Sequence, residues 1–246
     1  LVTQSWLSDR NAFRFCLRRV LRIWPALTIV VIIAALALGP VVTTLSINDY
    51  LIHGATWDYF QALIMRIHFV LPGVFNDNPG GCSVHGSLWT IPYDVRCYIV
   101  MAIIGFLGLL RGNKWIIAWG VVFFVWYIHK GIPDIIGHYV PGREFSAYFV
   151  LGTMLYCVKD KWLPHAWLAM GLAVVLACVL YWFNWRYLAL LMAIPICAIG
   201  FGMQPTPFFK RFGRLGDPSF GIYLYAYPVQ QTLLHYTYPE LNFYIS

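Results

Sequence analysis

Long apolar runs recur along this chain of 246 residues and restrict what it can fold into. A helix that crosses a bilayer needs about 20 mostly apolar residues. Seven runs approach that length, at 23–42, 88–110, 115–130, 144–158, 163–183, 185–203 and 217–238. Apolar residues make up 60% of the chain and charged residues 11%, against about 45–50% and about 25% in soluble proteins. The sequence therefore predicts an all-α, multi-pass transmembrane helix bundle.

A further run, "YFQALIMRIHFVL" (59–71), is too short to be assigned as a span by its length. If it does not cross, the cytoplasmic segments hold twelve basic residues: Arg10, Arg14, Arg18, Arg19, Arg22, Arg111, Lys114, Lys159, Lys161, Lys210, Arg211 and Arg214. The outer side then holds four, which are Arg66, Lys130, Arg143 and Arg186. Since cytoplasmic loops carry the excess of Lys and Arg, we expect about seven spans in one domain over 1–246. The outer loop 43–86 then contains a helix lying on the membrane surface.

The chain begins with Leu1 and ends at "ELNFYIS", which suggests a fragment lacking both ends. The first twenty residues do not resemble a signal peptide, because they carry four arginines and no long apolar core. The net charge of +7 is typical of basic cytoplasmic loops, so we expect no nucleic-acid partner. The six cysteines form no evident disulfide framework. The seven histidines are not spaced as metal ligands, so no metal is expected.

The first stretch that could carry chemistry is "FRFCLRRVLRIWPAL" (13–27). Arg18 and Arg22 are four residues apart and share a helix face, with Arg19 adjacent. Guanidinium groups at the cytoplasmic end of a span can grip phosphates bidentately. The alternative is a topology anchor whose side chains extend to the membrane interface. Pro25, early in the span, is expected to kink it.

The second stretch, "GSLWTIPYDVRCYI" (86–99), places two charges inside an apolar run. A charged side chain at bilayer depth costs at least about 2.5–3.5 kcal/mol. Asp94 must therefore face a partner or a water-filled cavity, and Arg96 raises the same question. The alternative to a functional site is an ion pair or hydrogen-bonded strut between spans.

Helical spacing separates the residues of this stretch into faces. Ser87, a plausible N-cap, shares one face with Asp94 and Tyr98, at separations of seven and four. Trp89 and Arg96 lie on another face. Pro92 is expected to bend the helix between them.

The third stretch is "RLGDPSFGIYLYAYPVQQTLLHY" (214–236). Asp217-Pro218 is a fair helix start, with proline at the first helical position. The span has a polar side, which consists of Ser219, Tyr223, Tyr227 and Gln230 or Gln231. Such a stripe lines a cavity or holds helices together.

Taken together, "LRRVLRIWPAL" (17–27), "GSLWTIPYDVRCYI" (86–99) and "RLGDPSFGIYLYAYPVQQ" (214–231) resemble the acyltransferase-3 family of bacterial membrane O-acyltransferases. That family includes O-antigen, exopolysaccharide and nodulation-factor acetyltransferases. The resemblance implies a bundle of about ten spans in the inner membrane, with both termini cytoplasmic. It also implies that acyl-CoA, commonly acetyl-CoA, donates an acyl group to a hydroxyl of a cell-surface carbohydrate.

The resemblance also implies roles for individual residues. Arg18, Arg19 and Arg22 match the family's arginine motif, for which the phosphates of CoA are the natural partner. Asp94, Ser87 and Arg96 are the catalytic candidates, and the substrate-cavity candidates are Trp89, Tyr98, Ser219 and Tyr223.

Two departures from the family pattern matter. The family usually has Glu where this chain has Asp94. The family's catalytic histidine lies on a first span that this chain lacks, so the expected general base is missing. The chain is then expected to be part of an enzyme or an inactive remnant.

We expect Asp94 to orient the missing histidine or the acceptor, and Arg96 to pair with a carboxylate or steady the site. The competing hypothesis is a transporter or flippase for lipid-linked saccharides, which also suits kinked spans and intramembrane charges. A non-catalytic scaffold is a third.

Overall fold

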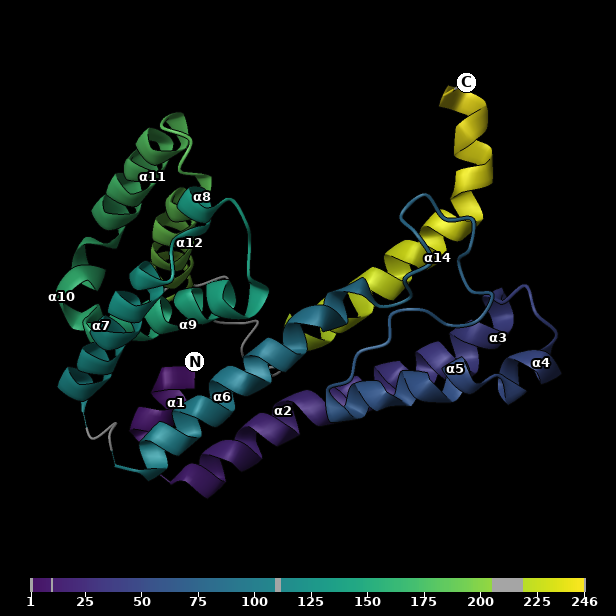
Figure 1. Cartoon of the computed structure of the whole chain (residues 1–246), viewed down its shortest axis with the longest axis horizontal. Coiled ribbons are helices and arrows are strands. Elements are labelled where there is room, and N and C mark those ends of the chain that lie inside the picture. The colour runs from purple at the N-terminus through teal and green to yellow at the C-terminus, as the bar shows by residue number, and fades with distance from the viewer. Residues whose placement is uncertain (1, 10, 109–111, 205–218, 246) are drawn as a thin grey trace. The chain divides into compact units, whose positions relative to one another are not determined.

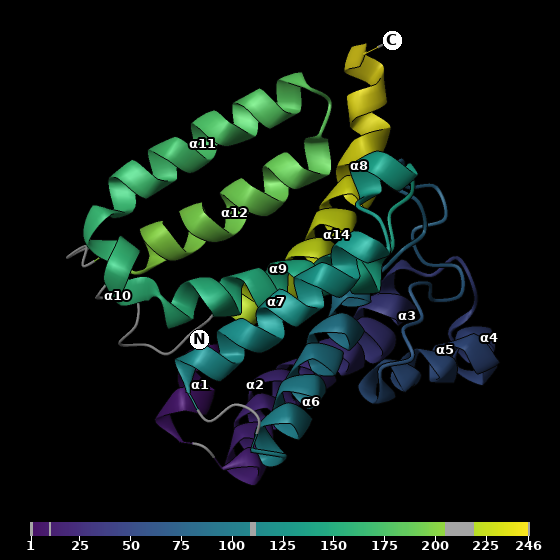
Figure 2. The same cartoon turned by 60° about the vertical axis from the view of Figure 1, so that its left-hand side comes forward.

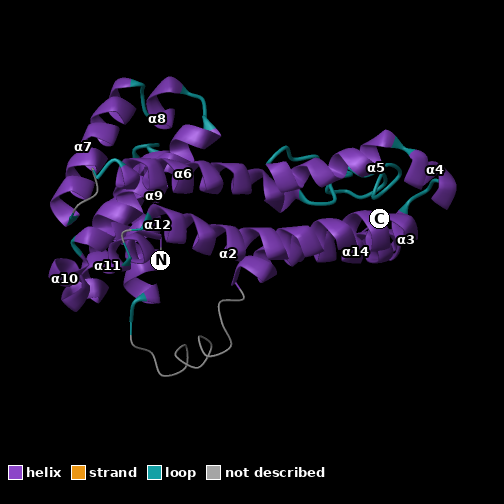
Figure 3. Cartoon of the chain, turned by 90° about the horizontal axis from the view of Figure 1, so that it is seen from below, coloured by secondary structure: helices purple, strands orange, loops and turns teal. Residues whose placement is uncertain are grey.

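The computed structural model describes residues 2–9, 11–108, 112–204 and 219–245, with side chains up to Thr237. Every element in these ranges is a helix, apart from an isolated antiparallel bridge between Val70 and Ser83 (Figure 3). The all-α prediction is confirmed. Asp217-Pro218, the predicted start of the last span, lies outside the described residues, and the helix there is described from Ser219.

The chain divides into two compact units, each assembled from segments distant in sequence. The first unit comprises Leu1–Cys16 and Val95–Lys210, and the second comprises Leu17–Asp94 and Arg211–Ser246. Composition does not mark this division, because apolar runs continue through both units. That the chain is one functional domain stays a prediction.

The described part of the chain has four helical stretches long and apolar enough to cross a membrane: Ala12–Val42, Gly86–Phe106, Asn113–Ile136 and Lys159–Trp182. A shorter apolar helix covers Arg186–Gly202. Helices also overlap the predicted spans 144–158 and 217–238, as α9 (Pro141–Cys157) and α14 (Ser219–Ile245). A multi-pass membrane protein is therefore supported, whereas the count of seven spans stays a prediction.

The first long helix begins earlier than its apolar run predicts. It consists of α2 (Ala12–Ile32), the π-helical turn η1 (Ile33–Leu38) and α3 (Gly39–Val42). Asn11 caps its start, because its side-chain oxygen accepts a hydrogen bond of 3.1 Å from the backbone N–H of Arg14. Pro25 lies inside α2, and the helix continues past it.

The following segment folds back along this helix within the second unit, through α4 (Ile47–Ile52), α5 (Gly54–Asp58) and η2 (Tyr59–Ile64) (Figure 1). The hydroxyl of Tyr50 donates to the carbonyl of Ala35 at 2.7 Å, and the indole of Trp24 donates to the carbonyl of Leu63 at 3.1 Å. Eleven residues of helix separate Ala35 from Trp24, which is about 16 Å at 1.5 Å per residue.

The segment then returns in extended form. Met65 adopts a left-handed conformation, with φ of 65°, and ends η2. The hydroxyl of Thr43, at the far end of the long helix, donates to the carbonyl of Pro72 at 2.8 Å. Residues 47–72 thus form a hairpin alongside the helix. The helix predicted over 59–71 is a shorter 3-10 helix over 59–64, and its position on the membrane surface stays a prediction.

The second motif begins with the 3-10 turn η3 (Gly86–Thr90), which leads into α6 (Ile91–Phe106). Pro92 is the second residue of α6. The first-turn N–H groups of an α-helix have no partner within that helix. Proline in this turn therefore costs no hydrogen bond of α6. Where the sequence predicted a bend at Pro92, the structure has a transition from the 3-10 turn η3 to the α-helix α6.

The first unit packs the remaining helices together. They are α1 (Val2–Ser8), α7 (Asn113–His129), α8 (Pro133–Ile136), α9, α10 (Lys159–Trp162), η4 (Leu163–His165), α11 (Ala166–Trp182) and α12 (Arg186–Gly202). The helices α11 and α12 lie side by side as a hairpin (Figure 2). The carboxylate of Asp134 caps α12 by accepting hydrogen bonds of 2.9 Å from the backbone N–H groups of Tyr187 and Leu188.

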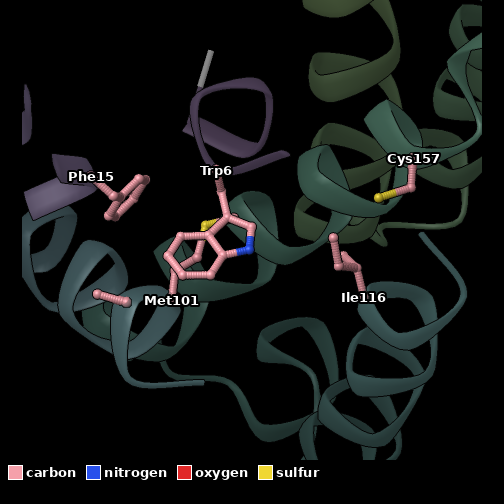
Figure 4. Close-up of a cluster of buried hydrophobic side chains, with 6 residues drawn as sticks. Trp6, Phe15, Met101, Ile116 and Cys157 are labelled. Atoms are coloured by element: carbon pink, nitrogen blue, oxygen red, sulfur yellow. The ribbon is translucent and has the colours of Figure 1, made fainter. Parts of the chain in front are cut away.

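A buried apolar cluster joins α1 to this unit and is drawn in Figure 4. The rings of Trp6 and Phe15 meet edge to face, with centroids 5.5 Å apart, and Met101 packs in the same cluster. Gly105 leaves the room that Trp6 occupies, because a Cβ atom at this position would overlap the indole ring. Trp6 therefore acts as the anchor that holds the N-terminal helix.

Candidate active site

Asp94 lies in the first turn of α6, and two other elements of the second unit bring polar groups toward it. Arg22 on α2 is close enough to interact electrostatically with its carboxylate. Tyr223 on α14 lies within the same range of Asp94. Each of the three motifs therefore contributes one residue to a common site. The sequence marked all three residues, and the fold of the second unit brings them together.

The hydroxyl of Tyr223 connects α14 to η3. It donates a hydrogen bond to the backbone carbonyl of Ser87, and its oxygen lies 2.6 Å from the hydroxyl oxygen of Thr90. A phenol carries a single O–H donor. Because that proton goes to Ser87, the Thr90 hydroxyl is the donor to Tyr223. Sequence inspection missed Thr90, whose only signal is its place in the second motif.

Ser87 does not cap a helix, contrary to the prediction. It lies inside η3, whose N-cap is His85, and its hydroxyl is buried without a hydrogen-bond partner among the described residues. Buried hydroxyls nearly always have a partner. The Ser87 side chain is therefore able to donate to or accept from a bound molecule next to the Tyr223 contact.

His85, directly before the turn, is completely buried. Burial lowers the pKa of this histidine to about 4, so the imidazole is neutral at physiological pH. The next residue, Gly86, packs so closely on the ring of Tyr227 that a Cβ atom would collide with it. These contacts fix the start of the turn against α14.

The polar side of α14 also contacts the loop that precedes η3. Asn78 donates through its amide to the carbonyl oxygen of Gln231 at 2.9 Å and to its side-chain oxygen at 2.8 Å. Gln231 donates in turn to the carbonyl of Gly81 at 3.3 Å and to the hydroxyl of Tyr227 at 3.2 Å. Gln231 is buried, whereas Gln230 is exposed. Of the two roles considered for this stripe, Tyr227 and Gln231 serve the one that holds elements together.

The arginine cluster lies on α2 in the second unit. Arg18 and Arg22 are half-buried, and Arg19 keeps only 9% of its surface exposed. A guanidinium that extends to the aqueous interface would be well exposed. The burial of Arg19 therefore argues against the topology anchor, and Arg22 connects the cluster to Asp94.

The other predicted site residues do not all join this group. Trp89 meets Tyr93 edge to face with ring centroids 6.2 Å apart, and Ser219 is the exposed first residue of α14. Tyr98 belongs to the first unit and packs on Phe149, with ring centroids 6.4 Å apart. Arg96 also belongs to the first unit, where it lines a cavity with Cys97.

Two further features were not predicted. In the first unit, buried Glu144 accepts hydrogen bonds from Arg143, at 2.7 and 3.0 Å, and from the Tyr127 hydroxyl. An Arg-Glu pair at the start of an apolar run is the only signal for it. In the second unit, a cavity of about 570 Å³ lies between the limbs of the 47–72 hairpin, and His53 and His68 are among its lining residues.

Comparison with known proteins assigns the chain to a family. Its residues 1–245 match the family model described as an acyltransferase domain, Acyl_transf_3. The search of curated proteins and the search of solved structures found no match. Because the match covers nearly the whole chain and includes all three motifs, this protein belongs to the acyltransferase-3 family.

Proposed function

We propose that this protein transfers an acyl group, commonly acetyl, from acyl-CoA to a hydroxyl of a cell-surface carbohydrate at the bacterial inner membrane. The observation that carries the proposal is the family match over residues 1–245. The grouping of Asp94, Arg22 and Tyr223 in the second unit supports it, because each comes from a different motif of the resemblance.

In the proposed reaction, the acceptor hydroxyl oxygen attacks the thioester carbonyl carbon of the donor. The C–O bond of the ester forms, the C–S bond breaks, and CoA leaves as a thiolate. The hydroxyl proton must pass to a base. Asp94 orients the acceptor hydroxyl or the group that takes its proton, and Ser87 supplies a further hydrogen bond. The resemblance implies that this base is a histidine on a first span of the full-length protein.

The arginines of α2 are proposed to bind the donor. CoA carries phosphates, and guanidinium groups bind phosphate oxygens with paired, charge-assisted hydrogen bonds. Arg18, Arg19 and Arg22 occupy two adjacent turns of one helix, and Arg22 interacts with Asp94. A donor held at this cluster is therefore held next to the carboxylate.

The carbohydrate is proposed to approach from the outer side. The hairpin of residues 47–72 and its cavity belong to the same unit as Asp94. His53, His68 and Phe69 line this cavity together with mainly apolar residues. The imidazoles can contact the hydroxyls of a sugar ring, and the apolar side chains can contact its apolar face.

The direct test uses membranes from cells with and without the protein. Acetyl-CoA labelled in the acetyl group is added to the membranes, and label in polysaccharide is measured. Transfer that depends on the protein is expected. Movement of lipid-linked saccharide across the membrane without CoA and without label transfer would instead identify a transporter.

A further inference from the structure

A cavity of about 520 Å³ lies between α6, α7 and α9 in the first unit. Its volume falls within the range of about 300–1,000 Å³ usual for small-molecule sites. Apolar side chains form most of its lining, and Arg96 is the one charged residue among the described residues that line it. A cavity with one charge in a largely apolar wall favours a ligand that has a charged end and a hydrocarbon part.

The contacts between the helices show which lining residues lie at the same end of the cavity. The sulfur of Cys97 lies 3.9 Å from the hydroxyl of Ser146, and Tyr98 packs on Phe149, so α6 and α9 run the same way. Arg96 is therefore level with Ser146, at one end of the cavity.

The opposite end is apolar. Ile104 lies eight residues after Arg96 on α6, which is about 12 Å along the helix. Ile116 of α7 lines the cavity too. The hydroxyl of Thr153, on α9, donates to the carbonyl of Phe149 at 2.8 Å and therefore needs no ligand acceptor. This part of the cavity suits a hydrocarbon chain.

The Arg96 end lies close to the end of a helix. The helices α7 and α9 run in opposite directions, because Gly120 approaches Met154 whereas Tyr127 contacts Glu144. Trp126, which also lines the cavity, is thus on the same side as Ser146 and three residues before the last residue of α7. Tryptophan is enriched at the headgroup level of membranes. The charged end of the cavity is therefore placed near lipid headgroups.

We propose that this cavity binds one acyl chain of an anionic glycerophospholipid, with the lipid phosphate held by the guanidinium of Arg96. Arginine binds phosphate oxygens bidentately. A net anionic headgroup is favoured over phosphatidylcholine, because the positive charge of Arg96 attracts an anionic headgroup and repels the ammonium of choline. The bilayer supplies the lipid laterally, so the site does not depend on acyl transfer.

The test is photo-crosslinking of the protein in nanodiscs. Two probes carry the same diazirine-labelled acyl chain, one with a phosphatidylglycerol headgroup and one with phosphatidylcholine. We expect the phosphatidylglycerol probe to label peptides covering 116–126 and 146–153 more strongly, and unlabelled phosphatidylglycerol to compete. Arg96→Gln should lower this labelling on the order of tenfold, from loss of a charge-assisted hydrogen bond. Arg96→Lys should retain more of it.

A matched pair on α6 separates the cavity from the general lipid surface. Val100 and Ile103 are about equally exposed, at 53% and 54%, and of the two only Val100 lines the cavity. Val100→Trp should block labelling of both peptides, and Ile103→Trp should leave it unchanged. Two results would overturn the proposal. One is that both probes label the peptides equally and that Arg96→Gln does not change this labelling. The other is that neither probe labels these peptides. Variants are compared only when their size-exclusion profiles match the parent protein.

Discussion

At the scale of single residues, Asp94 is a charged side chain within a largely apolar stretch of helix. Asp94 stands out because a carboxylate inside an apolar run must face a partner or a cavity. Its interaction with Arg22 and Tyr223 depends on the packing of α2 and α14 in the second unit. Thr90 could not be predicted, because a threonine at the start of a helix has many other uses.

The link between Tyr223 and Thr90 can be measured as a coupling free energy. Tyr223→Phe and Thr90→Val each remove one hydroxyl of the pair, and the double variant removes both. Because the hydroxyl oxygens are 2.6 Å apart, we expect a coupling of about 0.5–1.5 kcal/mol in the free energy of unfolding. Denaturant unfolding of the four proteins in one detergent measures it. Strictly additive effects would show that the hydrogen bond does not contribute.

His85 should make the second unit sensitive to acid. Its pKa is about 4 when folded and about 6.5 when unfolded, so between these values the unfolded chain binds a proton that the folded chain does not. The contribution of neutral His85 to the free energy of unfolding is therefore fully present above about pH 6.5, and it is lost as the pH falls toward 4. The difference in pKa corresponds to about 3 kcal/mol. Unfolding measured from pH 7 to pH 4 checks the slope.

The control for this prediction separates His85 from the other titrating groups. In His85→Gln the loss of stability between pH 6.5 and 4 should be smaller than in the parent protein. His138→Gln changes a histidine that is exposed and should leave the slope unchanged. An unaltered slope in His85→Gln would contradict a buried, neutral imidazole.

At the scale of elements, apolar runs predicted where helices lie better than where they begin and end. Each of the seven predicted spans overlaps a described helix, but α2 begins at Ala12 because Asn11 caps it. The run 59–71 has the composition of one helix, and the left-handed Met65 divides it. Contacts distant in sequence, such as the hydrogen bond of Trp24 to Leu63, determine the hairpin. No local pattern reports them.

Gln231 should hold the loop of residues 78–87 against α14. Gln231→Leu removes the side-chain partner of buried Asn78, which keeps only its hydrogen bond to the Gln231 backbone carbonyl. Leaving buried polar groups unsatisfied costs about 1–3 kcal/mol. We expect faster proteolysis within residues 73–84 and a lower unfolding free energy. Gln230→Leu, at the exposed neighbour, should cause neither change, and equal behaviour of the two variants would contradict the assignment.

The hairpin of residues 47–72 should reach well below the outer surface of the membrane. Leu63 is level with Trp24, nineteen residues before Thr43 on the same continuous helix, or about 28 Å along it. In a cysteine-free background, Leu63→Cys should react with an impermeant maleimide added outside much more slowly than Leu45→Cys. Similar rates would place the hairpin on the surface, as the distribution of basic residues between the loops first indicated.

At the scale of the whole molecule, the three motifs carry most of what the sequence could predict. They indicated the acyltransferase-3 family, and the match over residues 1–245 confirms it. The division into two units was beyond prediction, because each unit combines segments distant in sequence and the boundaries fall inside α2 and α6. The cavity at Arg96 was also not predicted, since three helices of one unit form it.

The most direct test of the account is the rate of acetyl transfer from labelled acetyl-CoA in membranes carrying Asp94 variants of the full-length protein. Asp94→Asn keeps the size of the side chain and removes its charge, so we expect transfer to fall by about 10²–10⁴-fold with the protein still folded. Asp94→Glu, which restores the family's usual residue, should retain transfer. Asp160→Asn, at an exposed carboxylate, should have no effect. Unchanged transfer by folded Asp94→Asn would contradict the central claim.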